Sequence, residues 1–345
     1  MSGGVDSSVC AYLSMQEGFG CTGVTLKLFE KEQAAANAND IEDARRVAEK
    51  LGISHRVADL TELFRKRVID PFVQSYRDGQ TPNPCIECNK HLKFGALLDI
   101  AAQMGCDTVV TGHYAVVEKD THGERYLLKK AADASKDQSY VLYGLTQRQL
   151  KHVRFPLGPL TKAETRAIAE EQGLVTAHKS DSQDICFVPA GDYAAFIEAF
   201  TGQAFPEGRF VTPDGDVLGR HRGIIRYTVG QRRGLGLALP APLYVMKKDV
   251  ANNDVVLCRN EELFSDSLDA GNVNFIPFDT LAGPLRVHAK IRYRHQEQPA
   301  TITPGENGTV HVVFDQPQRA VTPGQAVVFY DGDTVLGGGT ILSPE

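Results

Sequence analysis

The sequence predicts an α/β fold in its first half, with a parallel sheet covered by helices on both faces, followed by a β-rich second half. Strand-like runs alternate with amphipathic helical patterns up to about residue 195. Beyond that point, short strand-like runs alternate with turn sequences such as TPDGDV and TPGENGTV. This spacing is typical of a small mixed domain and of a barrel or sandwich. We therefore expect three domains, over residues 1–200, 201–262 and 263–345.

Local patterns predict the elements of the first half. The expected order is a helix after the loop at 2–8, a strand over 22–28, a helix over 41–51, a strand over 55–60, a helix over 90–104, a strand over 106–112 and a helix from 162 to about 173. Asp40 is placed to cap the second helix and Gly52 to end it. Thr161 and Glu164 form a capping box before the last helix. Because parallel strands share their carboxyl edge, we expect ligands at that edge.

The composition is that of a soluble globular protein. The 345 residues are 42% hydrophobic and 23% charged, and the net charge is −6. This balance excludes a protein coated in positive charge, although it is compatible with a local basic face. No apolar run approaches the ~18 residues of a membrane span, and no secretory signal opens the chain. We therefore expect a cytoplasmic protein that does not contact a membrane.

The loop SGGVDSS at residues 2–8 has the composition of an anion site. Its glycines allow backbone N–H groups to turn inward, and its serines add hydroxyl donors. The N-terminus of the helix that follows adds positive partial charge. The Lys-Ser/Thr ending of a Walker A loop is absent. The loop is therefore interpreted as a phosphate site, with a glycine-rich capped turn as the alternative.

Three of the seven cysteines stand in motifs. Cys85 and Cys88 lie in TPNPCIECNK just before a predicted helix, where a thiolate is stabilised. Such a pair is either a redox pair or half of a metal site, and no second closely spaced pair completes a zinc site. Cys186 lies in SDSQDICFV. The other four are expected to be buried thiols, namely Cys10, Cys21, Cys106 and Cys258.

Two segments of the β-rich half are basic. In RVHAKIRYRH at 286–295 the basic residues are even-numbered, so a strand would place them on one face. Residues 219–236 hold five arginines and no acid. Both segments suit contact with phosphates, and a solvated strand face is the alternative for 286–295.

The motifs together resemble a known family. SGGVDSS resembles the pyrophosphate loop of the ATP-pyrophosphatase superfamily, and it is followed in order by TPNPxxxCN, TGHYA, KDQSYxLYxL, FPLGxLTKxExR, DSQxICFV and GQRRGLG. In this combination the chain resembles the tRNA-specific 2-thiouridylases along essentially its whole length. The resemblance implies an adenine nucleotide alpha hydrolase-like domain, a small central domain and a C-terminal β-barrel that contacts tRNA. In that superfamily a strand precedes the loop, so we expect Met1 to be an internal methionine and the chain without that strand to have low stability.

The resemblance implies an activity. ATP with Mg²⁺ adenylates the C2 oxygen of the wobble uridine, in the anticodon region of tRNA, and a persulfide sulfur then replaces that oxygen. It assigns Cys88 as the nucleophile and Cys186 as the persulfide carrier, with a disulfide between them when the sulfur departs. It also implies a sulfur donor such as a cysteine desulfurase or a sulfur-relay protein.

Further site residues are implied by the same match. The nucleotide contacts are Ser2, Gly3, Gly4, Val5, Asp6, Ser7, Leu26 and Gly112. The tRNA contacts are Asn83, Pro84, Cys85, Lys136, Asp137, Gln138, Arg292 and Tyr293, and His113 and Gln325 complete the set. Many members have Asp at the position of Cys85 and Met at that of Leu26.

The thiol at position 85 leaves a second mechanism open. Cys85, Cys88 and Cys186 could hold three irons of a [4Fe–4S] cluster whose fourth iron binds hydrosulfide. Two other function classes also remain. A small-molecule adenylating ligase or amidotransferase would not need the paired cysteines, and a non-enzymatic iron–sulfur or RNA-binding module would not need the phosphate loop.

Overall fold

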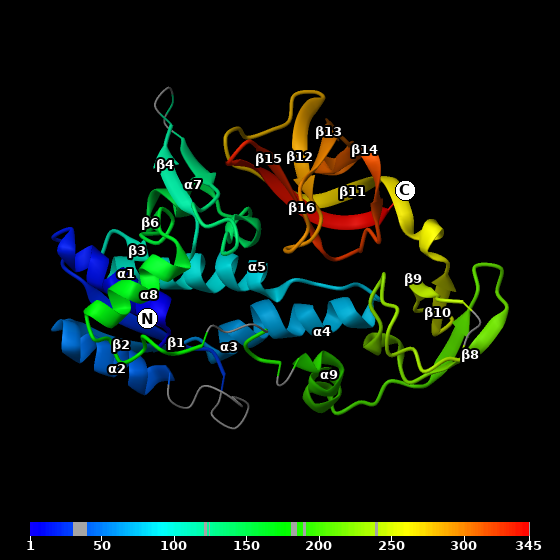
Figure 1. Cartoon of the computed structure of the whole chain (residues 1–345), viewed down its shortest axis with the longest axis horizontal. Coiled ribbons are helices and arrows are strands. Elements are labelled where there is room, and N and C mark those ends of the chain that lie inside the picture. Colours follow the sequence, from blue (N-terminus) through cyan, green and yellow to red (C-terminus); the bar gives the residue numbers. More distant parts are fainter. Residues whose placement is uncertain are drawn as a thin grey trace.

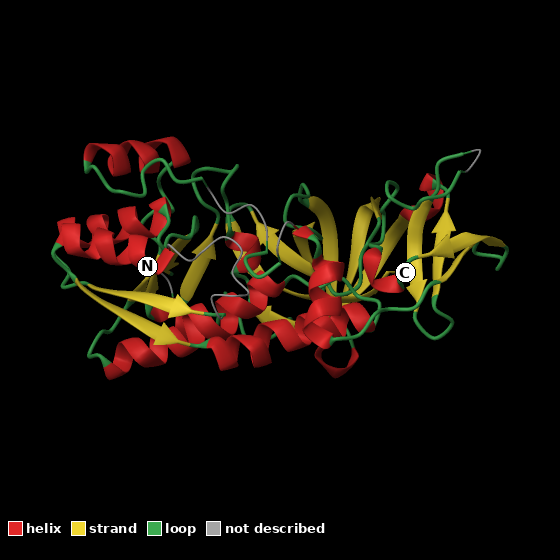
Figure 2. Cartoon of the chain, turned by 90° about the horizontal axis from the view of Figure 1, so that it is seen from below, coloured by secondary structure: helices red, strands yellow, loops and turns green. Residues whose placement is uncertain are grey.

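The computed structural model describes residues 1–29, 40–120, 123, 125–180, 185–188, 191–238 and 241–344. The N-terminal half, rich in helices, lies at one end, and the β-rich half lies at the other (Figures 1 and 2). The predicted change from an α/β half to a β-rich half is confirmed. In the described part of the chain, no helix is both long enough and apolar enough to cross a membrane.

The N-terminal half contains two parallel strand pairs. Its elements are α1 (Val5–Gln16), β1 (Thr22–Lys27), α2 (Asp40–Leu51), β2 (Ser54–Asp59), β3 (Val109–Val110), β6 (Val153–Arg154) and α8 (Lys162–Glu171). β1 pairs with β2 and β3 pairs with β6, both in parallel. The predicted capping box precedes α8, where Thr161 and Glu164 bond reciprocally. Leu26 therefore lies near the carboxyl end of β1, and Gly112 and His113 follow the carboxyl end of β3.

Two segments of continuous helix include π-helical turns. The first comprises α3 (Thr61–Phe64), η2 (Arg65–Ile69) and α4 (Asp70–Arg77), and the second comprises α5 (Pro84–Cys88), η3 (Asn89–Ala96) and α6 (Leu97–Gln103). The first segment is absent from the elements predicted above. The second begins earlier than the helix predicted over 90–104, and the strand predicted over 106–112 is only the two residues of β3. Two shorter helices are α7 (Gln147–Lys151) and α9 (Tyr193–Thr201), and short 3-10 turns cover 139–141, 224–226, 260–263 and 306–308.

The C-terminal part closes into a barrel. Its strands are β11 (Phe264–Phe275), β12 (Leu285–Lys290), β13 (Gln298–Pro304), β14 (Val310–Arg319), β15 (Ala326–Asp331) and β16 (Thr334–Pro344). Their order is β11-β14-β13-β12-β15-β16, and β11 also pairs with β16. A hairpin of the N-terminal half, β4 (Val116–Lys119) and β5 (Tyr126–Lys129), extends this sheet because β5 pairs with β16. The hairpin thus joins the two halves of the chain.

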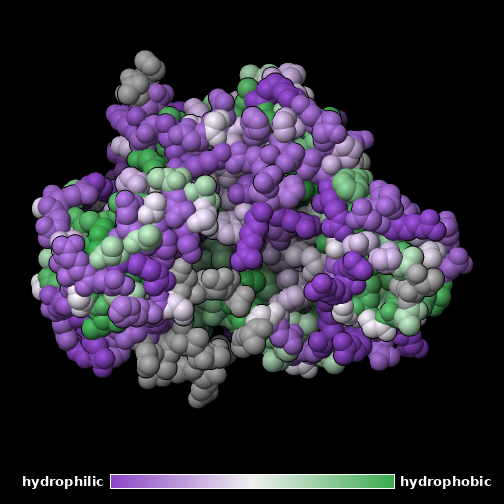
Figure 3. All heavy atoms as spheres, viewed as in Figure 1, coloured by the Kyte–Doolittle hydropathy of each residue, from purple (hydrophilic) through white to green (hydrophobic). Residues whose placement is uncertain are grey.

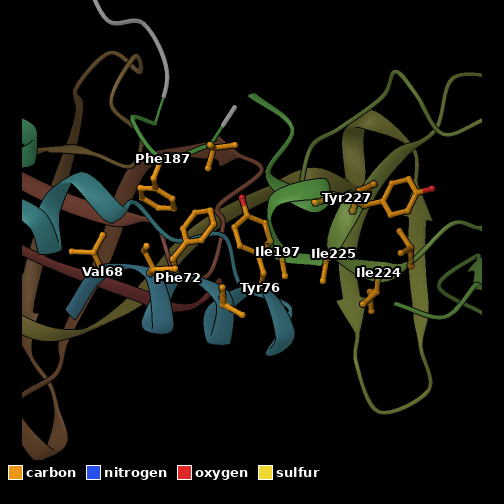
Figure 4. Close-up of a cluster of buried hydrophobic side chains, with 14 of the residues drawn as sticks. Val68, Phe72, Tyr76, Phe187, Ile197, Ile224, Ile225 and Tyr227 are labelled. Atoms are coloured by element: carbon orange, nitrogen blue, oxygen red, sulfur yellow. The ribbon is translucent and has the colours of Figure 1, made fainter. Parts of the chain in front are cut away.

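A four-stranded sheet lies in sequence between the N-terminal half and the barrel. Its strand order is β8 (Val217–His221), β7 (Gly208–Val211), β10 (Asp254–Cys258) and β9 (Tyr244–Asp249). One apolar core joins this sheet to α4 and α9. Figure 4 shows Phe187 beside Phe72 at one end of that core and Tyr227 at the other. The Phe187 ring meets the rings of Phe64, Phe72 and Phe196 at centroid distances of 5.5, 5.2 and 5.2 Å.

Replacing Phe187 by alanine is expected to lower the free energy of unfolding by about 3–5 kcal/mol, because it leaves a cavity among these rings. Urea unfolding followed by circular dichroism measures this loss. Phe19 is 47% exposed, so Phe19→Ala serves as the matched control and is expected to cost less than about 1 kcal/mol. Equal losses for the two variants would contradict an anchoring role for Phe187.

Candidate active site

The loop before α1 is held open by its own polar groups. Gly3 has a positive φ of 68°, which favours glycine, and Gly4 caps α1. The Ser2 N–H and hydroxyl both donate to Ser7 Oγ, at 3.0 and 3.1 Å, and Ser7 Oγ donates to the Gly4 carbonyl at 3.1 Å. The first N–H groups of α1 have no partner within the helix. These features give the predicted anion site its donors.

Asp6 anchors the loop to the rest of the domain. Its carboxylate accepts hydrogen bonds from Lys162 Nζ at 2.6 Å and from the Tyr114 hydroxyl at 3.1 Å. Gly112 follows β3 and packs on the same turn: a Cβ there would lie 2.8 Å from the Asp6 Cβ and 3.0 Å from the Ser7 nitrogen. Gly112 is therefore needed for the close approach of this strand end to the loop. Leu26, at the carboxyl end of β1, is half-buried.

The Cys85 and Cys88 side chains share one face of α5. The Asn83 side chain caps this helix by accepting the Cys85 N–H at 3.2 Å, and Pro84 fills the first turn. Cys85 is exposed, whereas Cys88 is buried with 8% of its surface exposed. The residues at i and i+3 meet on a helix surface, so the two sulfurs are neighbours.

Cys186 lies close to both of these thiols. It is exposed, and the residues on either side of it, Ile185 and Phe187, pack into the same core as Cys88. Burial of its sulfur, together with the smaller effects of the nearby Cys88 and Cys85 sulfurs, raises the pKa of the Cys186 thiol to about 12. Burial also raises the pKa of Cys88 and Cys85. The structure thus brings together the three cysteines that the motifs singled out.

All seven cysteines are free thiols, so the implied disulfide between Cys88 and Cys186 is not formed in this state. Cys10 and Cys258 are buried as predicted, but Cys21 and Cys106 are only half-buried. Among the described side chains, no group of three His, Cys, Asp or Glu residues is arranged to hold a metal ion. The three neighbouring thiols are therefore not placed, in the part of the chain that the structure describes, to bind one metal ion together.

Lys93 supplies the positive charge of this thiol cluster, and no sequence motif pointed to it. It is half-buried on the π-helical turn after α5, five residues beyond Cys88, which is one turn of such a helix. Its ammonium group lowers the pKa of each of the three thiols, against the effect of burial. The sequence carries no signal for this role, because the burial of Lys93 and its nearness to the thiols appear only in the folded structure.

The pH dependence of Cys186 reactivity follows from these shifts. Since only the thiolate reacts and the pKa is about 12, alkylation by iodoacetamide should rise about tenfold per pH unit from pH 7 to 11. Lys93→Met removes the stabilising charge, so its Cys186 should react more slowly throughout this range. Peptide mass spectrometry measures the rate at Cys186 alone. Lys90→Met, on the exposed side of the same helix, is the control and should match the wild type.

His113 is a buried, neutral imidazole. Burial lowers its pKa well below the ordinary value, and Lys93 lowers it further. The His113 Nδ1 atom lies 2.8 Å from Thr111 Oγ1, and the ring contacts those of Phe94 and Phe155. A neutral, fixed histidine can accept or donate a hydrogen bond but adds no charge.

The residues assigned to tRNA are mostly engaged within the protein. The Asp137 carboxylate accepts the Ala131 N–H at 3.0 Å and the Ser139 hydroxyl at 2.7 Å. Gln138 Oε1 accepts the Tyr114 N–H at 3.0 Å. Lys136, beside them, is half-buried. Asp137 and Gln138 therefore shape the loop that they belong to.

Tyr293 links the barrel to the thiols. It is 37% exposed, and its hydroxyl donates to the Asp137 carbonyl at 3.1 Å. Burial raises the Tyr293 pKa, with further contributions from Asp137 and Cys85, so its phenol lies near Cys85. The Arg292 guanidinium donates to the Ala320 carbonyl and to Thr322 Oγ1.

The basic strand face expected over 286–295 is wrong in part. β12 ends at Lys290, so Arg292 and Arg294 lie in the turn that follows. Arg286 forms a bidentate pair with Asp315 of β14, at 2.7 Å for each bond. The face thus carries both signs of charge, because the neighbouring strand supplies an acid that the local sequence does not contain. In the segment 219–236, Arg220 and Arg226 likewise pair with glutamates.

Gln325 holds the segment before the cysteines. Its Nε2 atom donates to the Thr81 carbonyl at 2.7 Å, and the Thr81 N–H donates to the Pro323 carbonyl at 3.0 Å. A Cβ on Gly324 would lie 2.9 Å from the Gln80 Cβ. The barrel is therefore packed directly on the TPNPC segment. Figure 3 shows a mostly hydrophilic face with hydrophobic side chains at a hollow near its centre, between the N-terminal half and the barrel.

The fold and the site define a class of protein: an α/β domain with an anion-binding loop at a helix N-terminus, joined to a β-barrel that packs on a thiol-bearing helix. Family models agree with this class. They match the tRNA methyl transferase HUP domain over residues 1–190, the tRNA methyl transferase PRC-barrel domain over 194–259 and the aminomethyltransferase beta-barrel domain over 265–341.

Curated relatives narrow the class. Two relatives are each 50% identical to this chain over 99% of its length: the tRNA-specific 2-thiouridylases MnmA of Clostridioides difficile and Acetivibrio thermocellus. The matches cover 96% and 97% of the lengths of these two relatives. The MnmA 1 protein of a Thermoanaerobacter species is 51% identical over 99% of this chain and 96% of its own. The chain belongs to the tRNA-specific 2-thiouridylase family, which confirms the resemblance seen in the motifs. NMN synthetase from Francisella tularensis matches with a TM-score of 0.34 at 15% identity, over 59% of this chain and 76% of that one, which is too weak to support an argument.

Proposed function

We propose that the protein is an ATP-dependent tRNA uridine 2-sulfurtransferase that adenylates the C2 oxygen of the wobble uridine and replaces it with a sulfur carried by Cys186. The observation that carries this proposal is the proximity of three thiols to one another on an α/β domain with an anion-binding loop. Membership of the family supports the substrate and the reaction. We propose the same domain limits as above, with the catalytic domain at 1–200, the central domain at 201–262 and the tRNA-contacting barrel at 263–345.

In the first step the loop holds the phosphates of ATP. The backbone N–H groups and hydroxyls of Ser2 to Ser7 would bind the β- and γ-phosphates, which leave as pyrophosphate with Mg²⁺ when the uridine oxygen attacks the α-phosphate. Magnesium in such sites is held largely by phosphates and water, which agrees with the few acidic groups on this loop. Leu26 and Gly112, at the ends of β1 and β3, would flank the adenosine.

In the second step sulfur replaces the adenylated oxygen. The terminal sulfur of the Cys186 persulfide attacks C2, and AMP leaves with the oxygen. The Cys88 thiolate then attacks Cys186 Sγ, which breaks the S–S bond and leaves the sulfur on C2 as the thiocarbonyl. The electron pair of the broken bond stays with that sulfur, and Cys88 and Cys186 become a disulfide that an external thiol must reduce. A donor such as a cysteine desulfurase or a sulfur-relay protein must reload Cys186.

The target base would enter between the thiol helix and the barrel. Asn83, Pro84 and Cys85 begin that helix, and Tyr293 lies beside Cys85. Reading a base in an anticodon loop requires that it be unstacked, and an aromatic side chain can then stack on it. The Asp137 carbonyl accepts the Tyr293 hydroxyl, so Lys136, Gln138 and Arg292, which adjoin these two residues in the chain, would contribute to the same entry.

The test is a thiolation assay on an unmodified tRNA transcript with MgATP and a persulfide source. We expect 2-thiouridine in digested tRNA, detected by mass spectrometry, with one AMP released for each base modified. Omitting ATP should abolish the product. Product without ATP would favour a sulfur-carrying RNA-binding module, and AMP release on small carbonyl substrates without tRNA would favour an adenylating ligase.

A further inference from the structure

Lys179 binds the phosphate loop from outside. Its ammonium group donates to the Gly3 carbonyl at 3.0 Å, to Asp40 Oδ1 at 2.6 Å and to Asp43 Oδ2 at 2.8 Å. The side chains are largely enclosed, with exposed fractions of 35% for Lys179, 21% for Asp40 and 26% for Asp43. One lysine thus joins the loop to the first turn of α2. None of the motifs assigned a role to it.

The bond to Gly3 fixes the direction of a peptide group. In a trans peptide the C=O and the following N–H point in opposite directions. Because Lys179 draws the Gly3 carbonyl toward itself, the N–H of Gly4 points away from Lys179. In the described part of the chain this N–H has no protein acceptor. It is therefore available, as one oriented donor, to an anion bound in the loop.

The bonds to Asp40 and Asp43 act through charge. Both carboxylates lie in the first turn of α2, against the loop: the Asp40 carbonyl oxygen would lie only 2.3 Å from a Cβ on Gly3. Two negative charges beside the loop would repel a phosphate chain bound in it. The single positive charge of Lys179, shared between them, offsets one of the two negative charges and so weakens that repulsion.

We propose that Lys179 is a positioning residue of the loop, which orients the Gly3–Gly4 peptide and partly offsets the negative charge of Asp40 and Asp43 so that the loop can bind the polyphosphate of ATP. This inference rests on the proposed binding of ATP by the loop. Lys179 touches no reacting atom. It acts through the orientation of the Gly3 backbone and through the electrostatic potential at the loop.

The experiment measures the Kd for ATP and for inorganic pyrophosphate directly, by calorimetry on the full chain without tRNA. Lys179→Met is expected to raise both Kd values at least tenfold. The matched control is Lys50, which lies on α2 and also donates to a backbone carbonyl, that of Gly173. Lys50→Met should leave both Kd values within twofold of the wild type. Binding by Lys179→Met within twofold of the wild type would overturn the proposal.

Two further variants separate charge from simple packing. Adding Asp43→Asn to Lys179→Met should recover at least threefold of the lost ATP affinity, whereas Asp43→Asn alone should bind ATP no more weakly than the wild type. A tenfold loss of ATP affinity in Asp43→Asn alone would overturn the electrostatic role. If Lys179→Met does not fold, Asp43→Asn alone still tests that role. If the wild type itself bound no ATP, the proposed function would fail first. If it bound ATP normally but did not thiolate tRNA, the role of Lys179 would stand without that function.

Discussion

Cys186→Ser is expected to abolish the transfer of sulfur to tRNA, by at least about a thousandfold, while ATP still adenylates the added tRNA and releases pyrophosphate. Serine has the size of cysteine but cannot carry a persulfide. The side chain lies at an exposed position between residues packed in the core, so the exchange should leave the fold intact. Mass spectrometry of nucleosides gives the thiolation rate, and release of labelled pyrophosphate gives the adenylation rate.

The other cysteines provide the controls for this prediction. Cys88→Ser should also lose thiolation, because Cys88 has to release the sulfur from Cys186. Cys106→Ser, at a half-buried position where the neighbouring thiol is Cys21, should keep wild-type rates. Thiolation by Cys186→Ser at a tenth of the wild-type rate or more would rule out Cys186 as the sulfur carrier.

Gly3→Ala is expected to weaken ATP binding about a hundredfold or more and to lower the free energy of unfolding by about 1–3 kcal/mol. The residue has a φ of +68°, and a Cβ would lie 2.3 Å from the Asp40 carbonyl oxygen and 2.8 Å from the Asp40 Cα. Both are backbone atoms, so the loop or the start of α2 has to move. Calorimetric titration with ATP and urea unfolding measure the two effects.

Gly18→Ala separates backbone strain from this collision. Gly18 also has a positive φ, of 87°, but nothing lies within 4 Å of its Cβ position. We expect this control to lose a similar amount of stability from strain, yet to bind ATP as the wild type does. If Gly3→Ala bound ATP with wild-type affinity, the loop would not be the phosphate site.

Local sequence patterns were sufficient for much of the α/β half. The capping box at Thr161, the strand β1 and the helix that starts at Asp40 each follow from neighbours within a few residues. The hairpin β4–β5 shows the limit of such patterns, because its pairing with β16 joins residues about two hundred positions apart. The π-helical turns also escape local rules, since an extra residue per turn leaves no distinct apolar period.

The site was predictable where a motif carries the chemistry. The loop, Cys88 and Cys186 were found from the sequence, and their proximity was not, since it depends on how Phe187 packs against α3 and α4. Lys93 and Lys179 were missed because a lone lysine has no signature until its neighbours in space are known. Arg286 misled for the same reason, as its partner Asp315 lies on another strand.

The most direct test of the account is a single-turnover experiment on protein loaded with persulfide, freed of excess sulfur and analysed for iron, to which MgATP and unmodified tRNA are added without oxygen. The account predicts one 2-thiouridine for each persulfide, formed by iron-free protein together with a disulfide between Cys88 and Cys186, and unaffected by Cys85→Ser. Product formed only by protein that contains iron, and lost in Cys85→Ser, would contradict it and establish the cluster route.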